Sequence, residues 1–137
     1  PTIVEMCDKL GILVWEETPL GNTFYNNEDL KATCVSSLKE IIRQNYNHPS
    51  IIIWGYMNEV GLGTSKLADK EKKKEIYEIT AKFAKELEGI LRTEDKTRLS
   101  TMALNSGGTS YYKDYGFSSL PNVIGWNTYY GWYKGAF

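Results

Sequence analysis

Polar and acidic side chains that could do chemistry follow three apolar runs of the chain. The run beginning IIIW leads to Asn58 and Glu59, and the run ILVW leads to Glu17. A third run, VIGW, leads to Asn127 and Tyr129. In α/β proteins with parallel strands, functional side chains collect at the carboxyl ends of the strands. We therefore expect these side chains to meet at one edge of a sheet.

Glu59 is the residue of this set best placed for proton transfer. A glutamate among apolar and aromatic neighbours can have a raised pKa, which keeps it protonated and able to act as an acid. Glycosidases need such an acid, together with a second carboxylate that serves as nucleophile or base. Spacing alone leaves another interpretation open, in which Asn58 and Glu59 cap a helix or form a loop ion pair.

The elements that position these residues alternate between helix and strand. Apolar residues at intervals of three and four predict helices over residues 2–10, 28–45 and 66–92. Short apolar runs predict strands over residues 12–15, 51–54, 98–103 and 123–127. A long loop, with room for one short helix, is expected over residues 105–122. Wholly apolar strands between amphipathic helices predict an α/β fold with a parallel sheet covered by helices.

Composition excludes several classes of partner and site. A net charge of −1 gives no electrostatic reason to expect nucleic acid or an anionic membrane surface, and no apolar run approaches the roughly 20 residues of a membrane helix. Cys7 and Cys34 are expected to be buried thiols, and no Cys/His spacing indicates zinc. His48, the single histidine, is expected to pack in a turn. We predict no metal site and no cofactor.

Four motifs together resemble the catalytic barrel of glycoside hydrolase family 2, which includes β-galactosidases, β-glucuronidases and β-mannosidases. NHPSIIIWGYMNE resembles the acid/base signature of that family, and CDKLGILVWEE resembles the strand before it. DKTRLSTMA and NVIGWNTYYGWYKG are similar to the next two strands. The motifs occur in the family's order and cover nearly the whole chain.

The resemblance implies a (β/α)8 TIM barrel, a retaining mechanism and a set of site residues. Glu59 matches the general acid/base, and Asn58 matches the asparagine that binds the sugar hydroxyl next to the reacting carbon. Asn127 and Tyr129 match pocket residues near the nucleophile, and Tyr133 matches a contact at the rim. Residues 1–137 are expected to be one fragment of the barrel, about strands three to six, with no internal domain boundary.

The sequence departs from the family pattern in two respects. The nucleophilic glutamate is expected in a later strand, after Phe137, so the fragment alone is expected to be inactive. The metal-binding run of some β-galactosidases is replaced by TPLG at residues 18–21, which indicates no magnesium site of that kind. Glu17 is expected to orient pocket residues or pair with a basic group rather than to act as the nucleophile.

The sequence predicts that the chain is part of a retaining exo-β-glycosidase that acts on terminal β-linked sugars, with β-galactosidase as first choice. β-Glucuronidase and β-mannosidase are alternatives within the family. A different class, a non-catalytic carbohydrate-binding half-barrel, also fits the aromatic cluster around Tyr129 and Tyr133. A flavodoxin-like domain is disfavoured because no Gly-rich phosphate loop follows the first strand. A half-barrel with open sheet edges is expected to self-associate, and the sequence does not indicate a cellular location.

Overall fold

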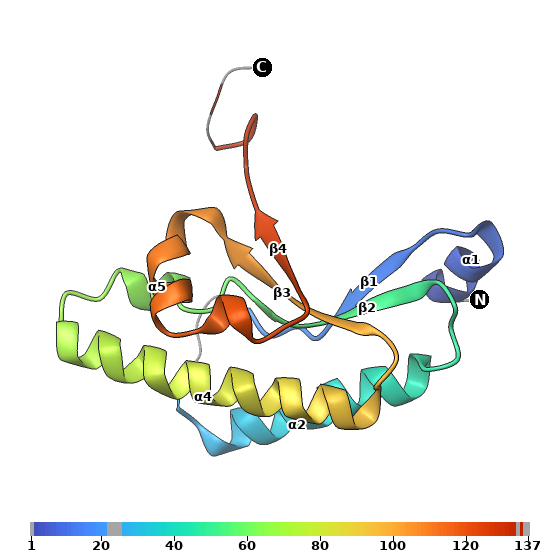
Figure 1. The fold of residues 1–137 in the computed structure, drawn as a ribbon, viewed down its shortest axis with the longest axis horizontal. Helices are drawn as coiled ribbons and strands as arrows, with labels where there is room; N and C mark the ends of the chain where they lie inside the picture. Colours follow the sequence, from blue (N-terminus) through green and yellow to red (C-terminus); the bar gives the residue numbers. More distant parts are fainter. Residues whose placement is uncertain (1, 22–25, 134, 136–137) are drawn as a thin grey trace.

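The strands form one four-stranded parallel sheet (Figure 1). The computed structural model describes residues 2–21, 26–133 and 135. The strands are β1 (Val14–Glu17), β2 (Ile51–Asn58), β3 (Leu99–Asn105) and β4 (Val123–Asn127), and their order in the sheet is their order in the chain. Parallel pairing at every step confirms the predicted α/β fold and is the topology of a partial TIM barrel.

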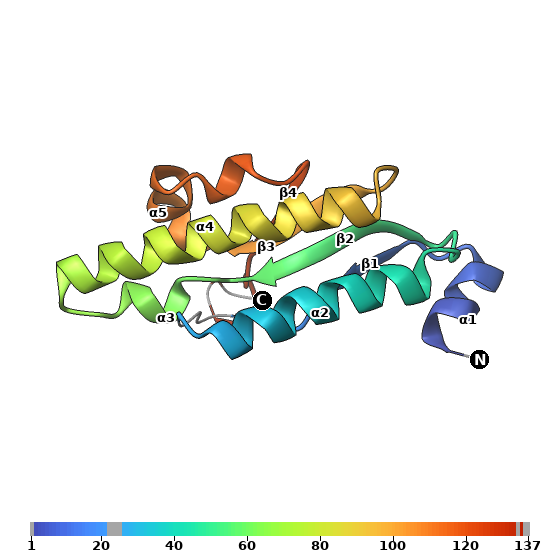
Figure 2. The same cartoon turned by 90° about the horizontal axis from the view of Figure 1, so that it is seen from below.

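Helices cover one face of this sheet, and α2 and α4 lie side by side there (Figure 2). The longer helices are α1 (Ile3–Leu10), α2 (Glu28–Asn45) and α4 (Lys70–Glu94). Each begins at a side chain that accepts a hydrogen bond from a backbone N–H of the first turn: Thr2, Asn27 and Asp69. None of the helices within the described ranges has the length and apolarity needed to cross a membrane.

The core lies between these helices and the sheet. Trp54 of β2 and Leu104 of β3 are fully buried, as are Ile42 of α2 and Leu91 of α4. Cys7 and Cys34 are buried free thiols, as predicted. His48 lies in the turn before β2, where its Nδ1 is 2.5 Å from the carboxylate of Asp8. Hydrogen bonds to this histidine and to Ser50 lower the pKa of Asp8 to about 2, so this contact ties α1 to the start of β2.

Asp95 holds the amino-terminal end of the sheet together and explains the DKTR motif structurally. Its fully buried carboxylate accepts hydrogen bonds from the Trp54 indole at 2.9 Å and the Arg98 guanidinium at 2.7 Å. Burial raises the pKa of Asp95, but hydrogen bonds from Thr97, Trp54 and Arg98 outweigh burial and keep it well below its usual range. Arg98 also donates to the Ile51 carbonyl at 2.7 Å, which joins β3 to β2.

The opposite face of the sheet carries the indole of Trp15. A Cβ added at Gly55 would lie 2.5 Å from the Trp15 Nε1, and a Cβ added at Gly125 would lie 2.3 Å from the far edge of the same ring. Trp15 therefore reaches from β1 across the sheet to β4, and a side chain at Gly55 or Gly125 would clash with its ring.

The elements differ from the sequence predictions mainly at their ends. β2 continues through Asn58 and β3 through Asn105, because the residues added to each strand pair with the neighbouring strand. The predicted loop over residues 105–122 contains η1 (Ser106–Gly108), α5 (Thr109–Asp114) and η2 (Phe117–Ser119). Residues 62–65 form one helical turn, α3 (Leu62–Ser65), rather than a loop, and α4 begins at Lys70 because Asp69 caps it.

Candidate active site

Three neighbouring strand ends bring Glu59, Asn105 and Asn127 together. Glu59 follows the last residue of β2, while Asn105 and Asn127 are the last residues of β3 and β4 and are paired in register. The predicted convergence at the carboxyl edge of the sheet is therefore confirmed for β2 and β4. Asn105 was not among the predicted site residues.

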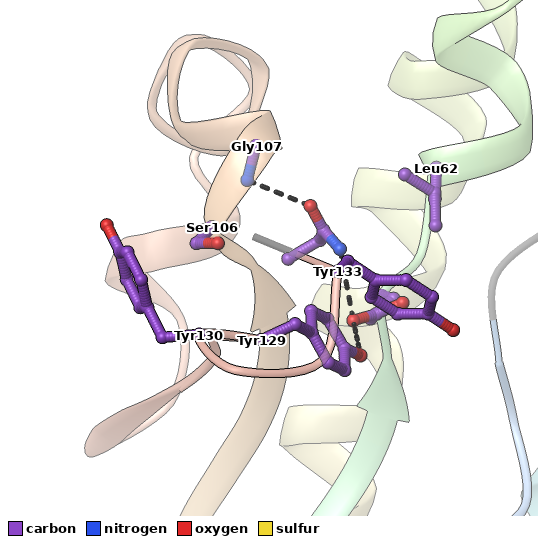
Figure 3. Close-up of a pocket in the computed structure, with 8 residues that line it drawn as sticks. Leu62, Ser106, Gly107, Tyr129, Tyr130 and Tyr133 are labelled. Atoms are coloured by element: carbon purple, nitrogen blue, oxygen red, sulfur yellow. Dashed lines mark hydrogen bonds between the residues drawn. The ribbon is translucent and has the colours of Figure 1, made fainter. Parts of the chain in front are cut away.

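The carboxylate of Glu59 accepts three hydrogen bonds, all on Oε1. The donors are the amide of Asn105 at 3.1 Å, the amide of Asn127 at 3.0 Å and the hydroxyl of Tyr129 at 2.6 Å. Figure 3 shows the Tyr129 hydroxyl directed at this carboxylate. Among the described residues, no hydrogen bond reaches Oε2 of Glu59. One carboxylate oxygen is thus fixed by the protein, and the other is left for a ligand.

The backbone at Glu59 helps to aim this side chain. Glu59 has a φ of 48°, the only positive φ at a non-glycine residue in the described part of the chain. Its N–H donates to the Ala103 carbonyl at 2.7 Å, beside an irregularity in the pairing of β2 with β3. A left-handed backbone at a glutamate is strained and persists only where surrounding contacts fix it. Here it turns a side chain that is only 6% exposed towards the strand ends.

The electrostatics of Glu59 differ from the prediction of a raised pKa. Burial raises the pKa of this carboxyl, but hydrogen bonds from Tyr129, Asn127 and Asn105 favour the charged form. Their combined effect exceeds that of burial, so the pKa of Glu59 lies below its usual value. The sequence predicted apolar and aromatic neighbours but did not indicate that three donors would be aimed at one oxygen.

Asn58 lies beside this carboxylate and is oriented by its neighbours. The Asn127 amide, which donates to Glu59, also donates a hydrogen bond to the Oδ1 of Asn58, at 3.0 Å. The backbone N–H of Asn58 donates to the Leu20 carbonyl at 2.8 Å, which holds the loop after β1 against the end of β2. Asn127 therefore bridges Asn58 and Glu59, and fixes both side chains relative to one another.

A cavity of about 440 Å³ opens over Glu59 and is bordered by tyrosines (Figure 3). Tyr129 and Tyr133 pack edge to face with ring centroids 5.2 Å apart. Tyr130 also borders the cavity, and its side chain is 84% exposed. A half-open cavity with one carboxylate and aromatic walls suits a polar ring that stacks while a group on it receives or gives a proton.

Glu17 lies apart from this cavity. It is the last residue of β1, pairs in register with Gly55 and points to the face that carries Trp15. Burial raises the pKa of Glu17, and a hydrogen bond from the Trp15 indole partly offsets that rise. Glu17 does not line the cavity over Glu59. Its role in orienting pocket residues stays a prediction.

Asn105 has an orientation that the surrounding chain determines. Its Oδ1 accepts from the Gly107 N–H at 2.8 Å, and its amide group donates to Glu59. Its own N–H donates to the Tyr112 hydroxyl at 3.3 Å. The signal in the sequence was present, because Asn105 ends the run LSTMAL as Asn58 and Asn127 end theirs. The predicted strand ended at residue 103 and the predicted loop began at residue 105, so Asn105 did not count as the end of a strand.

No group of three or more His, Cys, Asp or Glu side chains in the described ranges is arranged to hold a metal ion. Among the described residues that line the cavity over Glu59, that carboxylate is the one charged group. The chemistry that these residues offer is therefore proton transfer and hydrogen bonding to a polar ligand.

Comparisons with known proteins agree with this geometry. The family described as "Glycosyl hydrolases family 2, TIM barrel domain" matches residues 1–136. A β-glucuronidase of Bacteroides fragilis is 32% identical over 136 residues, which cover 94% of this chain and 17% of that protein. A putative β-glucuronidase of Formosa agariphila is 34% identical over 137 residues, covering 100% of this chain and 15% of that protein.

A solved structure of similar fold extends this agreement. The crystal structure of a β-glucuronidase of Bacteroides uniformis superposes with a TM-score of 0.89 at 44% identity, covering 97% of this chain and 16% of that one. The chain thus spans about a sixth of the length of each of these three relatives. The match to the family's barrel extends from end to end of the four-stranded sheet. The chain therefore belongs to glycosyl hydrolases family 2 and is part of that family's TIM barrel domain.

Proposed function

We propose that residues 1–137 supply the general acid/base of a retaining exo-β-glycosidase. The observation that carries this proposal is the clamped carboxylate of Glu59, held at three parallel strand ends under an open cavity. Asn105, Asn127 and Tyr129 occupy Oε1, so a proton on this carboxyl is carried by Oε2. That oxygen is the one free to meet the glycosidic oxygen of a substrate.

The proton moves twice in such a reaction. In the first step the nucleophilic carboxylate bonds to the sugar while Glu59 gives its proton to the glycosidic oxygen, whose bond to the sugar breaks, and the leaving group departs as an alcohol. In the second step the Glu59 carboxylate takes a proton from water as that water bonds to the sugar and the bond to the nucleophile breaks. Asn58 and Asn127 are proposed to bind hydroxyls of the sugar ring, and Tyr133 to pack at its rim.

The nucleophile is proposed to come from outside residues 1–137. Among the described residues that line the cavity, Glu59 is the only carboxylate. A retaining mechanism needs a second one about 5 to 5.5 Å away. A negative charge at that distance disfavours ionisation of Glu59 and would raise its pKa, opposing the three donors. The pKa of Glu59 is therefore expected to be higher in the full-length enzyme, where the nucleophile is present, than in residues 1–137 alone.

For the sugar, we infer a β-glucuronide rather than a β-galactoside. The relatives from Bacteroides fragilis and Formosa agariphila, which match 94% and 100% of this chain, are named β-glucuronidase and putative β-glucuronidase. One solved structure that covers 96% of the chain at 30% identity is described as a putative β-galactosidase of Bacteroides fragilis. A β-galactosidase of Thermoanaerobacterium thermosulfurigenes is 47% identical, but over only 49 residues, or 36% of the chain. This replaces our first choice of β-galactosidase.

The test is Glu59→Gln in the full-length enzyme, assayed on an aryl β-glucuronide with a poor leaving group. Loss of general acid catalysis is expected to lower kcat/KM about 10²- to 10⁴-fold. The matched control is Glu78→Gln on the exposed face of α4, where the carboxylate pairs only with Lys74. That control should keep the parental rate. A Glu59→Gln enzyme as fast as the control would end the assignment of Glu59 as the acid.

A non-catalytic carbohydrate-binding half-barrel is a second candidate, favoured by exposed rings beyond β4. Trp132 and Tyr133 are 76% and 74% exposed, and exposed aromatic faces suit sugar rings. This candidate predicts that the full-length protein binds a glycan in calorimetry and hydrolyses no member of a panel of aryl β-glycosides. Turnover of any member on that panel would favour the enzyme.

A further inference from the structure

A second cavity, of about 370 Å³, lies beside the cavity over Glu59. Leu62, Asn105 and Gly107 line both of them, and Figure 3 shows Leu62 and Gly107 at the first cavity. Because these residues are shared, the two cavities adjoin one another. We name the second cavity the Lys73 cavity, after the one charged residue among the described residues that line it.

The wall of the Lys73 cavity is joined by hydrogen bonds to the residues that follow Glu59. Tyr77 of α4 and Tyr111 of α5 stack with centroids 4.7 Å apart and an interplanar angle of 13°. Their hydroxyls donate to the carbonyls of Gly61 at 3.4 Å and Val60 at 3.3 Å, directly after Glu59. Gly61 has a φ of 84°, and a Cβ there would lie 2.7 Å from the Tyr77 ring. The cavity thus keeps a fixed position relative to the acid.

Lys73 brings an unpaired positive charge to this wall. Its side chain is half-buried, and its ammonium donates to the Ser65 carbonyl at 2.9 Å. None of the ion pairs found among the described residues includes Lys73, and no carboxylate is among the described residues that line its cavity. An ammonium has three donors, so two remain for a ligand. The group that fits them is a carboxylate or a sulfate.

The position of the general acid determines which part of a substrate would lie in the Lys73 cavity. The general acid must touch the glycosidic oxygen, which joins the sugar to its leaving group. The sugar is proposed to lie towards Asn58, Asn127 and Tyr133, and none of these three residues lines the Lys73 cavity. The leaving group is therefore proposed to extend towards Leu62 and Gly107, which line both cavities. Resting on the proposed function, we propose that the Lys73 cavity binds the leaving group and favours one that carries a negative charge.

The experiment measures kcat/KM of the full-length enzyme on matched phenyl β-glycosides of the sugar that it accepts. One leaving group carries a carboxylate, one a sulfonate in place of a sulfate, and one a neutral carboxamide. Ratios of charged to neutral substrate are compared between variants, so that intrinsic leaving-group reactivity cancels. In Lys73→Gln at least one of the two ratios is expected to fall about fivefold relative to the parent. The ratio that falls identifies carboxylate or sulfate.

The matched control is Lys74→Gln. Lys74 is the neighbouring residue, 61% exposed, and pairs with Glu78 at 3.9 Å. Its removal changes the net charge by the same amount and should leave both ratios at the parental value. The proposal is overturned if neither ratio falls in Lys73→Gln, or if both variants lower the ratios equally. A parental rate in Glu59→Gln, by contrast, would overturn the proposed function itself.

Discussion

At the scale of single residues, Glu59 is unusual because its neighbours favour its charged form, whereas an acid must hold a proton. Asn105, Asn127 and Tyr129 all donate to one oxygen. These donors fix the position of the carboxyl group, and the pKa of the working acid depends on the balance between them and the proposed nucleophile. The residues that donate hydrogen bonds to Glu59 should therefore influence its pKa and, through it, the pH range of activity.

Tyr129→Phe tests this balance. Loss of the shortest of the three hydrogen bonds removes stabilisation of the carboxylate, so the pKa of Glu59 rises. Glu59 reacts in its protonated form, so kcat/KM declines as the pH rises through that pKa. The alkaline limb of the pH profile of kcat/KM is expected to move to higher pH in the full-length variant.

Tyr130→Phe is the control for this profile. Tyr130 borders the same cavity but is 84% exposed and has no hydrogen bond to Glu59. The alkaline limb of the pH profile of Tyr130→Phe should coincide with that of the parent. An unmoved or acid-shifted limb in Tyr129→Phe would mean that this hydroxyl does not control the acid.

At the scale of elements, much of the site followed from the strand pattern, and the rest required the register of the sheet. Polar residues after apolar runs predicted the meeting of Asn58, Glu59 and Asn127. Asn105 was missed because LSTMALN is a weaker apolar run and its end was taken for a loop. The path of Trp15 over Gly125 depends on pairings across four strands. No local pattern at residue 15 indicates such a path.

Gly125→Ala tests the contact beneath Trp15. The new methyl group would lie 2.3 Å from the indole, so the ring or the strand must move. Overpacking of this kind is expected to lower the free energy of unfolding by about 1 to 3 kcal/mol. Denaturant unfolding of the full-length protein measures the change, and Trp15→Leu in the same chain should restore part of it.

Gly89→Ala in α4 is the matched control. Within the described part of the chain, no atom outside the adjacent residues and the helix backbone lies within 4 Å of a Cβ there, and alanine favours a helix interior. This variant is expected to be more stable by about 0.5 to 1 kcal/mol. If Gly125→Ala were as stable as the parent, Trp15 would not be confined by the two glycines.

At the scale of the whole molecule, the sheet face opposite α2 and α4 is only partly covered. Apolar side chains remain exposed at its amino-terminal end, with Leu99 at 48% and Val123 at 42%, and Ile3 of α1 is 80% exposed. The sequence predicted an incomplete barrel from the order of its motifs. It could not predict which side chains would stay exposed, because exposure depends on how the strands and helices pack.

Self-association of residues 1–137 produced alone is expected from this open face and from the unpaired edges of β1 and β4. Light scattering over a range of concentrations should show a mass that rises above that of one chain. Charged substitutions at Leu99 and Val123 should lower that mass. A single-chain mass at every concentration would count against the prediction.

The central claim is that Glu59 is the acid/base and not the nucleophile, and azide distinguishes the two roles most directly. In full-length Glu59→Ala, an aryl β-glycoside with a good leaving group can still form the glycosyl-enzyme, but no base activates water. Azide needs no base and can enter the space left by the side chain. The measurement is turnover with and without azide, with the configuration of the product. We predict faster turnover and a β-glycosyl azide, whereas an α-glycosyl azide, or a parental rate without azide, would contradict the account.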